Sequence, residues 1–250
     1  MTPAPAPDST AWAADTRVLA AACIDFHTHH PSREGERVVL DGRDTWGVHP
    51  WQAGSAMAVP SAPHGLLAIG ECGLDKLAPV PLAVQEQVLV RQLRLAQEWR
   101  LPVIVHCVRC IDQLMALRRA MRPTVPWVVH GFRGKPQQLQ SLLAAGFYVS
   151  FGFRFSEQSL VQCPLGRLLL ETDADPRPVS LLYAQVARLR GITVPSLIEA
   201  MQGHYEALFA RPEADPQVGD MASEADHRDR NARAREEKYL GESKLLTEKE

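Results

Sequence analysis

Apolar runs and amphipathic stretches alternate along this chain. Runs rich in Val, Ile and Leu predict buried strands, and they lie at 66–75, 102–106, 127–131, 147–152 and 168–173. Stretches whose apolar residues recur at a period near 3.6 predict helices. They lie at 85–100, 111–121 and 136–145, with two closing helices at 181–190 and 195–209. Residues 153–166 are expected to form a loop.

The N-terminal part of the pattern is less regular. Residues 23–29 form an apolar-leaning run that ends in His-Thr-His, and we expect a strand there. Residues 31–46 carry many charges around Val38-Val39-Leu40, which predicts a loop with at most an edge strand. Residues 45–51 predict a short strand that stops at Pro50, because proline cannot donate a hydrogen bond to a ladder.

Strands that alternate with helices predict a parallel sheet covered on both faces. Because polar residues close several of the strands, we expect one catalytic rim where the strand ends meet. The pattern favours an α/β fold of the TIM-type β/α barrel, whose sites lie at the carboxyl ends of the strands. The alternative is a doubly wound open sheet, which needs a glycine-rich phosphate loop after its first strand. Residues 27–30 read His-Thr-His-His at that point instead.

The composition restricts the class of protein but identifies no binding partner. With 250 residues, of which 46% are hydrophobic and 22% charged, the chain suits one large globular domain. The formal net charge of -2 exerts no general attraction on nucleic acid, so such binding would need a local basic patch. Five cysteines, no secretory leader and no run of 18 apolar residues predict a cytoplasmic protein with reduced thiols and no membrane span.

The two ends of the chain differ from its centre. Residues 1–16 are rich in Ala, Pro, Ser and Thr and predict a mobile leader. Residues 17–210 are expected to hold the barrel. Residues 211–250 contain 8 Lys and Arg against 11 Asp and Glu and few large apolar groups. We expect this charged tail to be helical or disordered, without a packed role.

Six polar side chains close the predicted strands. Alternate residues on a strand share a face about 6 to 7 Å apart, so two histidines in His-x-His can reach one ion. A carboxylate inside an apolar strand needs a positive neighbour when it is buried. Imidazole and carboxylate are ligands of divalent metals, and two ions bridged by a carboxylate would use all six. The six residues are His27, His29, Glu71, His106, His130 and Asp173.

Each of these residues also has an ordinary structural explanation. His106 fits a hydrogen-bonded core histidine, Glu71 fits an ion pair with Arg109, and Asp173 fits a cap of the following segment. Since four strands all end on residue types that bind metals, a common metal site explains the set better than separate structural roles do. Residues 107–110 also read C-x-x-C, but a single pair disfavours a structural zinc site, and we do not expect redox chemistry.

The order and spacing of six motifs resemble the TatD family of metal-dependent hydrolases from about residue 23 to residue 209. These motifs are Phe26-His27-Thr28-His29, Gly47-Val48-His49-Pro50, Ile69-Gly70-Glu71-Cys72-Gly73-Leu74-Asp75, Pro102-Val103-Ile104-Val105-His106-Cys107-Val108-Arg109, His130-Gly131-Phe132-Arg133-Gly134 and Glu171-Thr172-Asp173.

The resemblance implies a TIM-type barrel, two divalent ions (Mg, Mn, Zn or Co) and, as in several relatives, DNase activity. It implies that His27, His29 and Asp173 hold one ion, that His106 and His130 hold the other, and that Glu71 bridges them. Asp173 would also act as general base on the metal-bound water. His49, Arg109 and Arg133 match motif positions at the rim and are candidates for gripping a phosphate of the substrate.

The chain departs from the family pattern in two places. Only 17 residues separate His29 from Gly47, where the family usually has a helix, a strand and a further helix. One βα unit is therefore expected to be missing, which leaves about seven strands and a more open site. Residues 174–176 read Ala-Asp-Pro instead of the usual Ser/Ala-Pro-Tyr-Leu, and Arg133 stands where Ser is common. These changes concern substrate specificity.

Three functions are compatible with these observations. The first is a metal-dependent phosphodiesterase or nuclease that acts on DNA or RNA as a monomer, without a membrane or a stable protein partner. The second keeps the metals but hydrolyses a small ester, lactone or amide, since a fold does not determine a substrate. The third is a non-enzymatic barrel whose tail serves as an interaction arm, and the complete ligand set disfavours it.

Overall fold

The computed structural model describes residues 18–33, 35–55, 59–60, 63 and 65–209. The predicted leader 1–16 and the predicted tail 211–250 lie outside this part. The strands are β1 (Ile24–Thr28), β2 (Arg37–Leu40), β3 (Thr45–Trp46), β4 (Ala68–Asp75), β5 (Val103–Val108), β6 (Trp127–Val129), β7 (Tyr148–Phe151) and β8 (Leu168–Leu170). The α-helices are α2 (Leu82–Trp99), α3 (Ile111–Met121), α4 (Pro136–Ala144), α5 (Glu157–Gln162), α6 (Val179–Arg190) and α7 (Val194–Phe209), and short 3-10 turns lie at η1 (Pro50–Gln52) and η2 (Leu165–Arg167).

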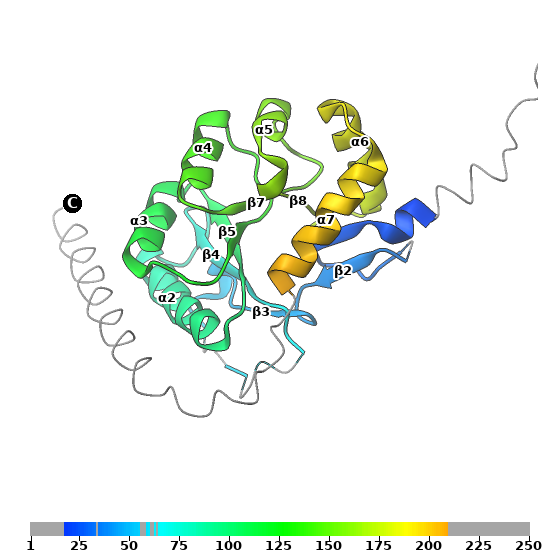
Figure 1. Cartoon of the computed structure of the whole chain (residues 1–250). Coiled ribbons are helices and arrows are strands. Elements are labelled where there is room, and N and C mark those ends of the chain that lie inside the picture. Colours follow the sequence, from blue (N-terminus) through cyan, green and yellow to red (C-terminus); the bar gives the residue numbers. More distant parts are fainter. Residues whose placement is uncertain (1–17, 34, 56–58, 61–62, 64, 210–250) are drawn as a thin grey trace, which may run out of the picture.

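The strands pair in parallel, as the alternation of strands and helices predicts. β3 to β8 form one sheet in sequence order, and β1 pairs with β2 in a second ladder. In Figure 1, helices α2 to α6 follow one another around the outside of the strands. Helix α7 packs against β1 and β8. The helices therefore cover the strands from outside, and the carboxyl ends of the strands share one rim.

A junction between β1 and β8 joins the two ladders. Thr28 and Asp173 form a parallel bridge, the backbone N–H of Asp173 donates to the carbonyl of His27 at 3.0 Å, and that of His29 donates to the carbonyl of Asp173 at 3.0 Å. The strand order around the molecule is thus β3 to β8, then β1, then β2. Together with the solved structures compared below, this arrangement identifies the α/β fold as a TIM-type barrel.

The described part of the chain contains eight strands, so the expected count of about seven is one too low. The expectation that Val38-Val39-Leu40 forms at most an edge strand is confirmed, because β2 pairs with β1 alone among the described strands. Val39 is fully buried there. The described part of residues 29–44 contains no helix on either side of β2. The chain has therefore kept the strand and shortened both of its connections, instead of losing a whole βα unit.

The predicted loop 153–166 contains a short helix that the periodicity does not reveal. Helix α5 spans six residues, which is too short for a 3.6-residue period to stand out. Its start is marked by Ser156, whose hydroxyl oxygen accepts a hydrogen bond from the backbone N–H of Ser159 at 3.4 Å. A serine followed by an acidic residue is a typical helix N-terminus, and it was the available sign.

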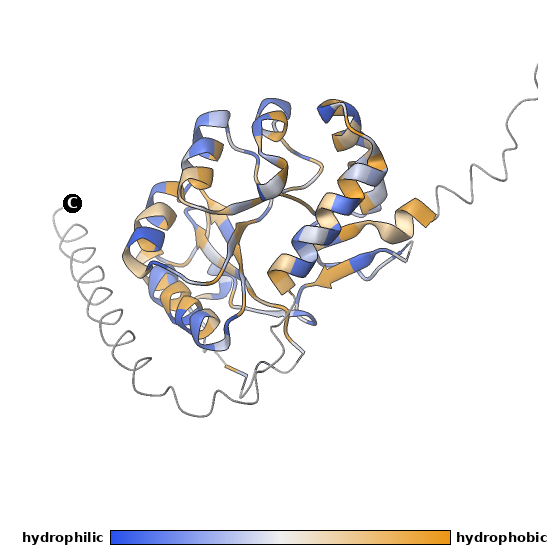
Figure 2. Ribbon diagram, viewed as in Figure 1, coloured by the Kyte–Doolittle hydropathy of each residue, from blue (hydrophilic) through white to orange (hydrophobic). Residues whose placement is uncertain are grey.

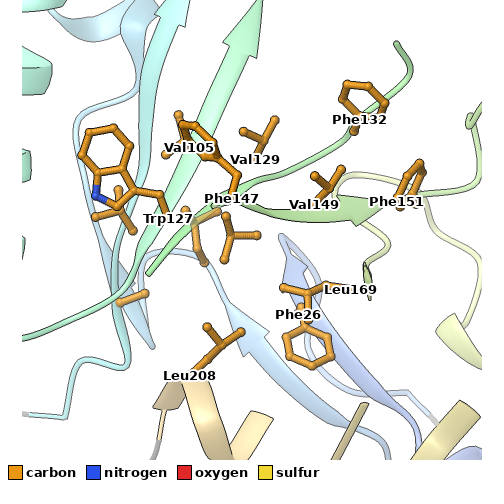
Figure 3. Close-up of a cluster of buried hydrophobic side chains, with 14 of the residues drawn as sticks. Phe26, Val105, Trp127, Val129, Phe132, Phe147, Val149, Phe151, Leu169 and Leu208 are labelled. Carbon is orange, nitrogen blue, oxygen red and sulfur yellow. The ribbon is translucent and has the colours of Figure 1, made fainter. Parts of the chain in front are cut away.

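The core lies inside the ring of strands and between the strands and the helices. Figure 3 shows Phe26 of β1, Val105 of β5, Trp127 of β6 and Leu169 of β8 in one cluster with Leu208 of α7. In Figure 2 the strands are mostly orange, whereas the outer helices carry both colours. This is the pattern expected of parallel strands buried on both faces and of amphipathic helices. No helix in the described part is long and apolar enough to cross a membrane.

The close approach of β4 to β5 depends on a glycine. Gly73 is in register with His106, and a Cβ atom at Gly73 would lie 1.9 Å from the carbonyl oxygen of His106. We expect Gly73→Ala to cost about 3 kcal/mol or more of unfolding free energy, because β5 must move away. Chemical denaturation measures this. Gly203→Ala is the control, since a Cβ there meets nothing within 4 Å and alanine favours a helix by up to about 1 kcal/mol. Equal stability of the two variants would contradict the expectation.

Candidate metal centre and adjoining cleft

Glu71 of β4 stands at the centre of a cluster of histidines. Its Oε1 atom lies 2.6 Å from Nδ1 of His106 and 2.8 Å from Nε2 of His130. Its Oε2 atom lies 3.5 Å from Nε2 of His27 and 3.7 Å from Nε2 of His29. The structure thus brings together strand ends from β1, β4, β5 and β6. The alternative pairing of Glu71 with Arg109 is absent from the described ion pairs.

Asp173 lies just after β8 and completes the cluster. Its Oδ1 atom is 3.4 Å from Nε2 of His29 and 4.0 Å from Nε2 of His27. The backbone of Asp173 is left-handed, with φ of 55°, a conformation that a non-glycine residue adopts only when its surroundings hold it. All six residues predicted from strand ends therefore converge on one site.

Buried polar groups within β1 and just after β8 hold this junction in place. Oδ1 of Asp25 accepts the backbone N–H of Thr172 at 2.9 Å, and Oδ2 accepts the Thr172 hydroxyl at 2.6 Å. The Thr172 hydroxyl oxygen also lies 2.9 Å from the Thr28 hydroxyl. These contacts connect residues about 145 positions apart in the sequence and set the spacing between His27 and Asp173.

His27 shows most directly that the site fits a cation. Its side chain is 1% exposed, and neither ring nitrogen has a hydrogen-bond partner. Buried polar atoms normally have a partner, since leaving one unpaired is costly. The Nε2 atom faces carboxylate oxygens of Glu71 and Asp173 at 3.5 and 4.0 Å. An ion between these atoms would satisfy the histidine and the acids together, and the donor types match those of divalent metals.

His49 lies inside this cluster. Its Nε2 atom is 3.3 Å from Oε1 of Glu71, and its ring centroid is 4.4 Å from that of His106. Three groups of ligand atoms lie close enough to hold an ion: His27 with His29 and Glu71, His27 with His130 and Asp173, and His49 with Glu71 and His106. The position of His49 gives it a possible ligand role beside the phosphate-gripping role that the motif implies.

Three further carboxylates orient the histidines, and the pattern of strand ends did not single them out. Oδ2 of Asp75 lies 3.3 Å from Nε2 of His106, and Oε1 of Glu171 lies 3.2 Å from Nδ1 of His130. Oδ2 of Asp41 lies 3.6 Å from Nδ1 of His29. Carboxylates behind a metal-ligating histidine fix its orientation and raise its basicity. The available signs were the acids at strand ends next to predicted ligands, namely Asp75 four residues after Glu71 and Glu171 two residues before Asp173.

The acids and histidines of the cluster hold each other charged. Burial raises the pKa of Glu71, but His130, His106 and His27 outweigh it and keep that pKa well below its ordinary range. Burial likewise raises the pKa of Asp173, but the hydrogen bond from His29 and the charges of His130 and His27 together outweigh it, so the pKa is lowered. For His130, Glu171 and Glu71 outweigh burial and raise the pKa well above its ordinary value. A hydrogen bond to Asp173 raises the pKa of His29.

These raised pKa values predict proton release when a metal binds. His29 and His130 carry more protons near pH 7 than free histidine does, and a metal ligand must be neutral imidazole. Metal affinity should therefore rise with pH until both histidines are deprotonated. Calorimetric titration of Mn²⁺ in two buffers with different ionisation enthalpies measures the protons released. Equal heats in the two buffers would contradict this expectation.

A cleft of about 1060 Å³ adjoins the cluster. His106, His130 and Asp173 contribute to its walls, together with three exposed arginines. Arg109 follows β5, Arg119 lies on α3, and Arg133 lies between β6 and α4. Arg109 and Arg133 were predicted from motifs, whereas Arg119 was not, because on a helix it looks like an ordinary surface residue. Besides Asp173, Asp112 is the acidic residue in the lining, so arginine predominates along the cleft.

None of the five cysteines forms a disulfide bond in the described part of the chain. Burial raises the pKa of Cys107 to about 12, which keeps the thiol protonated and unreactive. The C-x-x-C spacing therefore reflects a strand end at Cys107 followed by the helix start at Cys110.

The family described as "TatD related DNase" matches residues 23–210. A protein of Citrobacter rodentium named 3'-5' ssDNA/RNA exonuclease TatD is 30% identical over 218 residues, which are 72% of this chain and 82% of the relative. The uncharacterized metal-dependent hydrolase YjjV of Escherichia coli K12 is 35% identical over 140 residues, 52% of this chain and 54% of the relative.

Solved structures show the same fold. The crystal structure of YJJV, a TatD homolog from Escherichia coli K12, superposes with a TM-score of 0.65 at 24% identity and covers 77% of this chain and all of the other. A hydrolase of the TatD family from Entamoeba histolytica superposes with a TM-score of 0.58 at 15% identity, covering 78% of this chain and 89% of the other. At these identities of 24% and 15%, the superpositions show only that the fold is shared.

Proposed function

The chain belongs to the TatD related DNase family, and from that premise we propose that it is a divalent-metal-dependent phosphodiesterase that cleaves single-stranded DNA or RNA. The observation that carries this proposal is the junction of the Glu71 cluster with the arginine-lined cleft. The cluster offers nitrogen and oxygen ligands for cations, and the cleft offers guanidinium groups for anions. A phosphodiester chain is a substrate that needs both.

The site would hold two divalent ions, and Glu71 would be a ligand available to both. His27, His29 and Asp173 would hold one ion, and His106 and His130 would hold the other, with His49 next to the second. When bound, such ions neutralise charge on phosphoryl oxygens and lower the pKa of a bound water. All of these ligands come from one chain, so we expect a monomer to be active.

The residues of this chain then have separate tasks. Asp173 has a lowered pKa and is therefore ionised near neutral pH, so its Oδ atoms can accept the proton of the attacking water. Its side chain is 30% exposed, which leaves it accessible from the cleft. Arg109 and Arg133 would bind non-bridging phosphate oxygens through paired N–H groups. Asp75 and Glu171 would keep the His106 and His130 rings in place.

The test compares substrate classes under controlled metal content. Protein freed of metal with a chelator is refilled with Mg²⁺, Mn²⁺, Co²⁺ or Zn²⁺ and assayed on single-stranded DNA and RNA, on p-nitrophenyl acetate and on a lactone. We expect metal-dependent cleavage of the nucleic acids and at least a hundredfold loss in His106→Ala. His204→Ala is the matched control, since His204 contacts Leu168 at the other end of β8 from Asp173. Hydrolysis of the acetate or lactone alone would favour a carbon-centred substrate, and full activity of His106→Ala would refute the proposal.

Arg119 provides a test of the cleft that leaves the cluster intact. We expect Arg119→Ala to raise KM for a long single-stranded oligonucleotide about 5- to 10-fold, because one phosphate contact is lost, and to leave kcat within twofold. The salt dependence of kcat/KM should become shallower for the same reason. Arg188→Ala is the control, because Arg188 lies on α6 and does not line the cleft. An unchanged KM and salt dependence would remove Arg119 from the substrate path.

A further inference from the structure

Trp51 is the aromatic residue among the large exposed hydrophobic side chains of the described part. It is 51% exposed and lies in η1, directly after His49 and Pro50. An exposed indole leaves apolar surface in water, and its flat ring and N–H group suit it to contacts with a partner or a ligand. The proposed catalytic steps leave Trp51 without a role.

Two hydrogen bonds attach Trp51 to the metal centre. Its Nε1–H group donates to Oδ2 of Asp75 at 2.8 Å, and the same oxygen lies 3.3 Å from Nε2 of His106. Its backbone N–H donates to Nδ1 of His49 at 3.3 Å. One contact is made with His49, which is itself a candidate ligand, and the other reaches the candidate ligand His106 through Asp75. The indole is therefore a fixed group at the edge of the centre.

A fixed and exposed aromatic ring next to a phosphodiester site suits a nucleobase. Every base presents a flat π-face, and stacking on an aromatic side chain changes affinity by about 5- to 150-fold per base, largely independent of sequence. An indole already held by Asp75 loses little freedom when a base stacks on it. Trp51 does not line the arginine cleft, so it would contact a part of the substrate that the arginines do not reach.

We propose that Trp51 is a stacking platform for the nucleobase next to the scissile phosphate, and that Asp75 orients both this platform and the His106 ring. The inference rests on the proposed function and adds a base-binding subsite to it. Substrates that carry a base at this position should be preferred over those without one. Asp75 would then couple the position of the base to that of the metal centre.

The first experiment uses intrinsic fluorescence, which does not depend on turnover. The protein contains five tryptophans, and a base stacked on one of them quenches its emission. We expect dAMP to quench the metal-loaded wild type, and deoxyribose 5-phosphate, which has no base, to have no effect. Trp51→Phe should lose the quenching, and Trp99→Phe, altered at the end of α2, should keep it. Quenching that persists in Trp51→Phe would overturn the proposal.

The second experiment compares dinucleotides with a single scissile bond. One substrate carries both bases, and in each of two others one base is replaced by hydrogen. We expect the wild type to cleave one of the two abasic forms about 5- to 150-fold more slowly than the full substrate. Trp51→Ala should reduce that ratio to within twofold, and Trp51→Phe should keep most of it. A merely structural role of Trp51 would lower all three rates equally and leave the ratio unchanged.

The outcomes separate this inference from the proposed function. If the metal-loaded wild type cleaves none of the dinucleotides and no longer oligonucleotide, the proposed function fails, and the fluorescence result alone then decides whether Trp51 binds a base. If it cleaves all three dinucleotides at equal rates, the function stands and the platform is refuted. The platform is also refuted if Trp51→Ala keeps the wild-type preference for the full substrate.

Discussion

Glu71→Gln is expected to lower metal-supported hydrolysis at least about a thousandfold, the largest effect of any single substitution in this chain. Glu71 belongs to two of the three groups that can hold an ion. Its carboxylate also lies within 3.7 Å of five histidines: His27, His29, His49, His106 and His130. The amide keeps the shape but removes the negative charge that would hold the cations.

The measurement for Glu71→Gln combines metal content with kcat/KM. Elemental analysis should show that the variant retains less metal than the wild type after dialysis, and circular dichroism should show an intact fold. Glu98→Gln is the matched control, because Glu98 is exposed near the end of α2, away from the cluster. Wild-type metal content together with wild-type activity in Glu71→Gln would show that Glu71 does not bridge the site.

Asp173→Asn should lower kcat by about 10² to 10⁴, the range found when a general base is removed. His27, His29 and Glu71 remain as ligands, so we expect metal content at saturating metal to stay near that of the wild type. KM should change less than kcat, because the arginines of the cleft are untouched. The amide cannot accept the proton that the ionised carboxylate accepts.

Kinetics at several pH values separate the two roles of Asp173. If Asp173 is the base, the acidic limb of the pH profile of kcat should be lost in Asp173→Asn, since the wild-type limb reports protonation of this carboxylate at a pKa below its ordinary value. If Asp173 is a ligand only, activity should return with excess metal. A variant that retains more than a tenth of wild-type kcat with the acidic limb unchanged would rule out the base role.

The convergence of the candidate ligands was predictable because strand ends are visible in sequence. In a parallel barrel all carboxyl ends of the strands meet at one rim, so His27, Glu71, His106 and Asp173 could be brought together without a structure. The orienting acids were not predictable in the same way. Asp41 lies in a charged loop, and whether such a residue faces solvent or His29 depends on how the loop folds.

Local signals also explain where the predicted architecture was incomplete. The strand count was one too low because charged residues surround the short apolar run of β2. Pairing with β1 makes this run an edge strand of the barrel. Helix α5 has too few residues for a period to be detected. The contribution of His49 to the cluster follows from the turn at Pro50 and η1, which directs the imidazole towards Glu71. The same turn places Trp51 next to Asp75.

The junction of β1 with β8 determines when the centre can be complete. His27 and Asp173 stand almost 150 positions apart and become neighbours through the backbone bridge of β1 to Asp173 and through the Asp25–Thr172 contacts. On the ribosome the N-terminal ligands emerge long before Asp173 is synthesised, so the nascent chain carries unpaired imidazoles until its last strand closes the ring. Contacts of this sequence separation form slowly, since the loop entropy must be overcome first. We therefore expect full loading of the proposed metal centre only in the finished domain, since any fragment that ends before residue 173 lacks one of the candidate ligands.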